Sequence, residues 1–144
     1  MTDEKVSPYN FDSQLVAERV ELGVTFRIYE NRIFHVSIPK DMKIGKSVID
    51  CGYSFLDENG DGRFFNLYEF DSFSDIEPEV REWAADTSGN LYTFCDAIVI
   101  RNLAQKIIAD FYLKVNKPQM PTKIFYSVEK ALDWIKEVQL DTEF

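Results

Sequence analysis

The stretch that decides the fold is residues 94–138, which reads FCDAIVIRNLAQKIIADFYLKVNKPQMPTKIFYSVEKALDWIKEV. Residues 97–100 form an unbroken apolar run, which is typical of a strand buried on both faces of a parallel sheet. A segment with helical periodicity follows over 102–116, then a short strand at 124–126, then a second amphipathic helix. Strands that alternate with helices need crossover connections, so this stretch predicts an α/β layer fold.

The N-terminal half adds an antiparallel start to this sheet. Apolar and polar residues alternate over 20–29 and again over 34–38, which predicts a hairpin with one face inward. A helix over 42–56, a strand over 64–70 and a short helix near 78–87 follow. The predicted order is ββαβαβαβα: a mixed sheet that starts with an antiparallel hairpin and continues with parallel strands, with helices packed on it.

Capping residues mark three of the predicted helices. Asp41, Asn102 and Ser127 each stand where a side-chain oxygen can accept a hydrogen bond from the first turn. The helix over 102–116 has a broad apolar face, and we expect it to be heavily covered. This face comprises Leu103, Ala104, Ile107, Ile108, Phe111 and Val115.

Length and composition favour one domain. The chain has 144 residues, of which 45% are hydrophobic and 15% aromatic, enough to bury a sizeable core. We assign residues 1–13 to a flexible leader and residues 14–144 to a single domain. Cys51 and Cys95 lie in no CxxC or Cys/His cluster, which predicts two buried thiols in a reducing compartment.

Charge excludes some classes of protein and suggests a kind of partner. The net charge of −9 argues against nucleic-acid binding. No apolar run approaches the roughly 20 residues of a transmembrane segment, and no secretory signal is found, so a cytoplasmic location is predicted. Residues 57–86 carry ten acids and two bases, a net charge of −8, whereas residues 101–123 carry five bases and one acid, a net charge of +4. This asymmetry favours docking of a protein partner, or anion contact at Arg101 and Asn102, where a strand ends and a helix begins.

Three sequence features resemble parts of known metal, phosphate or catalytic sites, but each lacks residues that such a site requires. Residues 57–62 open like a calcium loop, yet the twelfth position is Tyr68 and a strand follows. Gly45-Lys46-Ser47 resembles the tail of a phosphate loop, but Lys40 stands where a glycine is required. His35, the only histidine, has no acid or nucleophile at a telling spacing. We therefore predict no metal, no cofactor and no catalytic residue.

The order of elements resembles that of the STAS superfamily, which is shared by sulphate transporters and anti-sigma factor antagonists. The likeness is greatest to its SpoIIAA-like branch, which includes STAS/SEC14-like domains, and it covers about residues 20–138. It is carried by residues 95–106, 117–125 and 127–135, which are patterns of core and turn.

The resemblance implies a non-catalytic cytoplasmic protein-interaction module, and a regulatory role is expected on the same ground. In antagonists of that superfamily, a serine in an Asp-Ser-Ser-Gly-like segment is phosphorylated, which breaks partner binding. The corresponding segment here is Asp71-Ser72-Phe73-Ser74, where Asp71 and Ser72 match and the next two residues differ. Ser72 and Ser74 are thus phosphorylation candidates. The 71–77 loop and the helix start at Arg101-Asn102 form the expected docking surface, and a homodimer is left open.

Two other functions remain open from the sequence. The first is a carrier of a small hydrophobic ligand or lipid in a pocket lined by the abundant Phe and Tyr residues. A wide apolar cavity between helices and sheet would favour it, and a solid core would weaken it. The second is an enzyme, which requires His35 or a cluster of acids to converge in a cleft.

Overall fold

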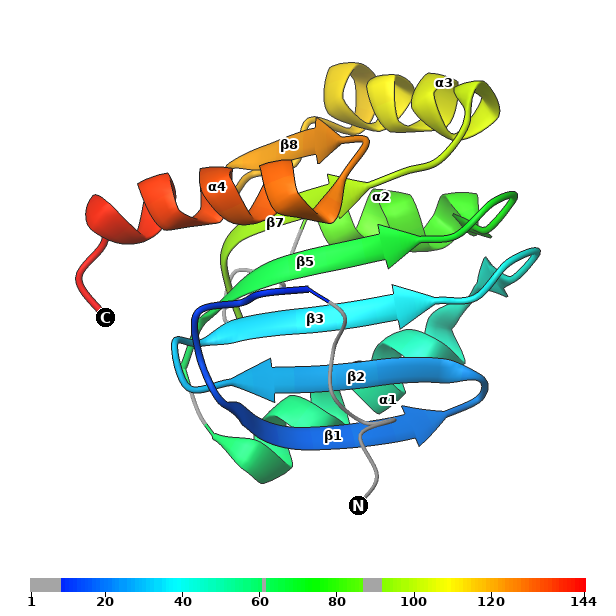
Figure 1. Cartoon of the computed structure of the whole chain (residues 1–144). Helices are drawn as coiled ribbons and strands as arrows, with labels where there is room; N and C mark the ends of the chain where they lie inside the picture. The colour runs from blue at the N-terminus through cyan, green and yellow to red at the C-terminus, as the bar shows by residue number, and fades with distance from the viewer. Residues whose placement is uncertain (1–8, 61, 87–91) are drawn as a thin grey trace.

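The computed structural model describes residues 9–60, 62–86 and 92–144. Its main sheet has six strands in the order β1-β2-β3-β5-β7-β8 (Figure 1). They are β1 (Leu15–Glu21), β2 (Val24–Tyr29), β3 (Ile33–Ile38), β5 (Phe64–Phe70), β7 (Thr93–Val99) and β8 (Thr122–Phe125). β1, β2 and β3 pair antiparallel, whereas β3, β5, β7 and β8 are parallel. The predicted α/β fold with a mixed sheet, antiparallel first and parallel beyond, is confirmed.

Helices cover both faces of this sheet. They are α1 (Lys46–Asn59), α2 (Pro78–Asp86), α3 (Leu103–Phe111) with its π-helical continuation η2 (Tyr112–Asn116), and α4 (Val128–Leu140). In Figure 1, α4 lies in front of the sheet and α1 and α2 lie behind it. Asn102 and Ser127 cap α3 and α4 as predicted, since each side chain accepts a hydrogen bond from a backbone N–H of the first turn. No helix in the described part of the chain has the length and apolar character needed to cross a membrane.

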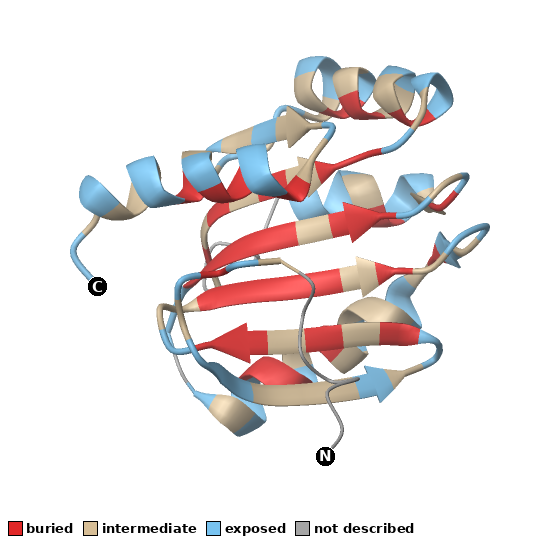
Figure 2. Cartoon of the chain, in the orientation of Figure 1, coloured by how far each residue is buried: buried red, intermediate tan, exposed pale blue. Residues whose placement is uncertain are grey.

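The core is divided into two layers by the sheet. On the front face, Phe65, Leu67 and Ala97 pack with Ala131 and Ile135 of α4. The back-face layer places Phe26, Phe34, Ile38 and Phe64 against Phe55 and Leu56 of α1. Figure 2 shows the result: β3 and β5 are buried along most of their length, while the outer side of α4 is exposed.

The first predicted strand is in fact two strands. The chain reverses at Leu22 and Gly23, which both have positive φ angles of 53° and 82°, so residues 20–29 form the end of β1 and all of β2. A two-residue hairpin turn is compatible with glycine at such φ angles. The alternation of apolar and polar residues continues through the turn, so a period of two does not distinguish two strands from one.

The approach to the first long helix also differs from the prediction. The helix begins at Lys46, with Gly45 and not Asp41 at its N-cap. Asp41 lies in a turn with φ of 64°, and β4 (Lys43–Ile44) follows and pairs with β6 (Asp75–Ile76) in a second, two-stranded sheet. Strands of two residues are too short to give a periodic signal.

Part of the predicted leader packs against the sheet. Phe11 is 3% exposed and stacks on Tyr29, with ring centroids 4.2 Å apart. The Asn31 amide donates to the Phe11 carbonyl at 3.1 Å. Residues 9–13 thus differ from the prediction of a flexible leader, because isolated aromatic residues in a polar segment give no periodicity. Residues 1–8 lie outside the described residues.

Candidate functional site

A cavity of about 160 Å³ lies between the back face of the sheet and helices α1, α2 and α3. Tyr68, Asp96 and Ile98 form part of its floor. They lie on β5 and β7, in the middle of the sheet, yet are only half-buried. The cavity explains why these central residues are only half-buried, because the helices above the two strands leave space beside the three side chains.

Small residues on the helices make this space. Gly52 on α1, Ala84 on α2 and Ala109 on α3 all line the cavity. A larger side chain at any of these positions would occupy part of the cavity. At Gly52, for example, even a Cβ atom would lie 3.3 Å from the Phe26 ring. The remaining walls are aromatic or aliphatic for the most part.

Two carboxyl groups interrupt this apolar lining, and that of Asp75 is paired with Arg81, whereas that of Asp96 is not. Asp96 Oδ1 accepts a hydrogen bond from Asn66 Nδ2 at 2.9 Å. Burial raises the pKa of Asp96 to about 6, and the hydrogen bond from Asn66 offsets only part of that rise. At neutral pH the carboxyl group is therefore mostly ionised, with one neutral donor for support.

Three tyrosines share the cavity with this carboxyl group. Tyr53 of α1, Tyr68 of β5 and Tyr112 of η2 all line the cavity. Burial raises the pKa of each, that of Tyr53 to about 12, and the charge of Asp96 raises all three further. The cavity thus combines an apolar body with three phenols, the Asp75–Arg81 ion pair and the carboxyl group of Asp96, an arrangement suited to binding a small molecule.

A second polar cluster lies on the front face of the sheet. His35 Nε2 is 2.8 Å from Glu69 Oε1, while Arg101 and the Tyr9 hydroxyl donate to Glu69 Oε2 at 2.9 and 3.0 Å. Burial alone would raise the pKa of Glu69, but the hydrogen bonds from His35 and Tyr9 and the charge of Arg101 outweigh it and lower the pKa. His35 is 1% exposed and packs beside Phe11, so this cluster fastens the N-terminal segment to the sheet.

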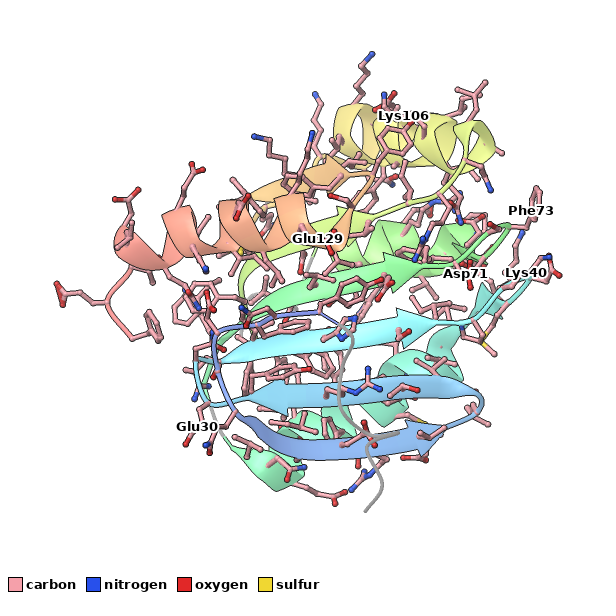
Figure 3. The ribbon with its side chains drawn as sticks, viewed as in Figure 1. Glu30, Lys40, Asp71, Phe73, Lys106 and Glu129 are labelled. Atoms are coloured by element: carbon pink, nitrogen blue, oxygen red, sulfur yellow. The ribbon has the colours of Figure 1, made fainter. Side chains whose placement is uncertain are left out.

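The predicted site residues meet at the C-terminal ends of the parallel strands. Figure 3 shows Asp71 and Phe73 beyond the arrowhead of β5. Gln105 of α3 donates to the carbonyls of Asp71 and Ser74 at 2.7 and 2.9 Å, and its Oε1 accepts from the Arg101 N–H at 2.7 Å. The 71–74 loop is thereby tied to the start of α3.

The accessibility of the two candidate serines differs. Ser74 is 1% exposed, and its hydroxyl donates to the Asp71 carbonyl at 2.6 Å. Ser72 is half-buried, and its N–H is bonded to the Asp71 carboxylate. A modifying enzyme would have to open the loop to reach Ser74, whereas Ser72 remains the more accessible candidate.

The bonds made by Gln105 lead to a prediction for stability. Replacing Gln105 with Leu removes the donor to two loop carbonyls and the acceptor for the Arg101 N–H, and we expect a loss of about 2 kcal/mol. Urea denaturation of the Gln105→Leu variant measures this loss. The same substitution at the exposed Gln14 is the control, and an equal change in both variants would contradict the role of Gln105.

The expectation that the helix over 102–116 is heavily covered is wrong for one side of it. Leu103, Ile107, Phe111 and Val115 are between 53% and 71% exposed. Gln105, Ala109 and Tyr112 instead face the body of the protein. We call the four exposed residues the α3 stripe. The sequence shows apolar residues on both sides of this helix, and only the position of the sheet decides which side is covered.

Other candidate chemistry gains no geometric support. Within residues 9–60, 62–86 and 92–144, no three His, Cys, Asp or Glu side chains gather closely enough to hold a metal ion. Asp61 of the calcium-like segment lies outside the described residues. Cys51 on α1 and Cys95 on β7 are free thiols, and Cys95 is fully buried.

Asp96 and its tyrosines were not singled out by the sequence analysis. The sequence does contain a signal for Asp96, because it is the only charged residue in the run Phe94–Ile100. A charge in an otherwise apolar central strand is costly unless it has a partner, so such a residue points to a site. The three tyrosines come from α1, β5 and η2, and only the tertiary fold brings them together.

Comparison with known proteins identifies a family but no activity. A family model described as "Domain of unknown function (DUF7793)" matches residues 27–139, and the chain belongs to this family. No curated protein and no solved structure matches the chain.

Proposed function

We propose that this member of the DUF7793 family is a binding protein for a small, largely apolar molecule held in the cavity behind the sheet. One observation carries the proposal: the central strands β5 and β7 border about 160 Å³ of space that the helices do not fill. Protein interiors are otherwise packed nearly as densely as organic crystals, so unfilled apolar space beside central strands supports a binding site.

The size of the cavity restricts the ligand. Pockets for drug-sized molecules measure about 300 to 1,000 Å³, whereas an apolar cavity of about 150 Å³ accommodates benzene. A single aromatic ring with a short substituent fits the available space, and a whole lipid does not. Of the functions left open by the sequence, the geometry best supports the carrier of a small hydrophobic ligand.

Toluene is a suitable first probe of the cavity. Burying a hydrocarbon of this size gains about 5 kcal/mol, so we expect a Kd of about 0.1 to 1 mM. Two-dimensional NMR should show chemical-shift changes at the residues that line the cavity. An Ala109→Leu variant fills the space and should abolish binding. Ala104→Leu adds the same side chain to an exposed position of the same helix and should leave it intact.

Two outcomes would contradict the proposed binding of toluene in the cavity. Toluene-induced shifts that persist in the Ala109→Leu variant would place the ligand elsewhere. Absence of binding in the wild-type chain, with the fold intact by the same spectra, would remove the proposed function.

A second candidate function, protein interaction, is favoured by the α3 stripe. Four exposed apolar side chains on one face of a helix are typical of an interaction surface. The candidate occupant is a second copy of the chain, since α3 can pair with α3 about a two-fold axis. Sedimentation velocity should then give a dimer for the wild type and a monomer for Ile107→Glu. A monomeric wild type would contradict self-association.

A further inference from the structure

We propose that the ligand of the cavity is a small organic cation, an apolar molecule with an ammonium group that contacts Asp96 and the aromatic side chains of Tyr53, Tyr68 and Tyr112. This inference rests on the proposed function and specifies the chemical class of the ligand. It is carried by the position of the Asp96 carboxyl group in a cavity that is mostly apolar and aromatic, and whose other carboxyl group, that of Asp75, is paired with Arg81.

The carboxyl group of Asp96 lacks a charged partner within the described residues. It accepts a hydrogen bond from the neutral amide of Asn66. A buried carboxylate is normally paired with a cation, and an unpaired one is unfavourable. An ammonium ion bound in the cavity would supply the missing charge. An anionic ligand would be repelled, and a neutral hydrocarbon would leave the carboxylate as it is.

Aromatic side chains complete the site for a cation. Tyr53, Tyr68 and Tyr112 border the same cavity as Asp96. Ammonium groups bind favourably to aromatic rings, and more strongly where water is excluded. The net charge of −9 adds a general attraction for cations.

The other groups around Asp96 do not compete for this role. Thr122 of β8 is its register neighbour and carries no charge. Arg81 of α2 also lines the cavity, but its guanidinium lies 3.3 Å from Asp75 Oδ1 and forms an ion pair with it. The three tyrosines have pKa values raised above 10, so they stay neutral across the range in which Asp96 titrates.

Binding of a cation should depend on pH through Asp96. Burial raises the pKa of this group to about 6 in the absence of ligand, and a cation binds to its ionised form. Between pH 7 and the pKa of the ammonium group of the ligand, the affinity should be constant. Below pH 6 it should fall about tenfold for each pH unit, because the carboxyl group must first lose a proton.

The experiment compares benzylamine, which is protonated at neutral pH, with toluene, its neutral counterpart of similar size. We expect benzylamine to bind the wild-type chain at least tenfold more tightly than toluene at pH 7.5, measured by NMR titration or calorimetry. In the Asp96→Asn variant this preference should disappear, so that the two probes bind with about equal affinity. Asp50→Asn removes an exposed carboxylate of α1 and should leave the preference unchanged.

The outcomes separate this inference from the proposed function. Binding of toluene without a preference for benzylamine, or a preference that survives Asp96→Asn, would overturn the organic-cation inference and leave the pocket in place. Failure of both probes to bind the folded chain would overturn both. A preference that does not weaken between pH 6 and pH 5 would assign the selectivity to a group other than Asp96.

Discussion

The Glu69→Ala variant should lose about 3 kcal/mol of unfolding free energy. Glu69 is 8% exposed and accepts hydrogen bonds from Tyr9 and Arg101, with His35 2.8 Å from its other oxygen. Removing one partner of a buried charged cluster leaves the others without compensation, which typically costs about 3 to 5 kcal/mol. We take the lower end because the Arg101 side chain is 42% exposed and can turn to water.

Urea denaturation followed by circular dichroism measures this loss. The control is Glu58→Ala, which removes an exposed carboxylate paired with Arg19 on the surface and should change the unfolding midpoint far less. The N-terminal segment should also loosen, because Tyr9 loses its bond to the sheet; faster amide exchange around Phe11 would report this. Equal midpoints for the two variants would contradict the role of Glu69.

The same cluster makes the fold sensitive to acid. Its contacts lower the pKa of Glu69 below the ordinary value of 4.5. The stabilisation is therefore complete above pH 4.5 and is lost as the pH falls through the lowered pKa of the folded state. The urea midpoint of the wild type should decrease as the pH is lowered through this range. The urea midpoint of the Glu69→Ala variant should lack this part of the decrease.

The second large effect should have the opposite sign. We expect the Asp96→Asn variant to be more stable than the wild type by about 2 kcal/mol at pH 8. The pKa of Asp96 rises from 3.8 to about 6 on folding, so the folded state holds an unfavourable charge at high pH. The full linkage would be about 3 kcal/mol, and the new amide recovers only part of it because it also needs hydrogen-bond partners.

The pH dependence provides the check on this mechanism. A raised pKa means that the folded state binds more protons between pH 3.8 and pH 6, so the stability of the wild type should fall as the pH rises through that window. The Asp96→Asn variant should lack this fall and should match the wild type near pH 4. A variant that is equally or less stable at pH 8 would show that Asp96 does not carry the buried charge.

The sequence predicts most of the fold because its signals are local. The apolar run at 97–100 and the caps at Asn102 and Ser127 fix β7, α3 and α4 to within a few residues. The turn at Leu22-Gly23 is not predicted, because alternation of apolar and polar residues does not indicate where the chain reverses direction. The two-residue strands of the second sheet escape because they depend on pairing with each other.

The candidate site was less predictable for a physical reason. Arg101, Asn102 and Asp71 could be placed at one end of the sheet because the ends of parallel strands coincide. The cavity depends instead on where small residues of three helices stand above β5 and β7, and no residue pattern along the chain expresses a missing volume. The partnership of His35 with Glu69 likewise requires the register of β3 against β5.

The outer strands of the sheet have a consequence for handling the protein. β8 has four residues and follows Pro118 and Pro121, while β1 has an irregular register at its start and carries Glu18, Arg19 and Glu21. Short, charged or irregular margins are poor templates for adding another chain by backbone pairing. Concentrated solutions should consequently resist fibril growth during storage, and any association through α3 would leave the β-sheet of each copy closed to further extension.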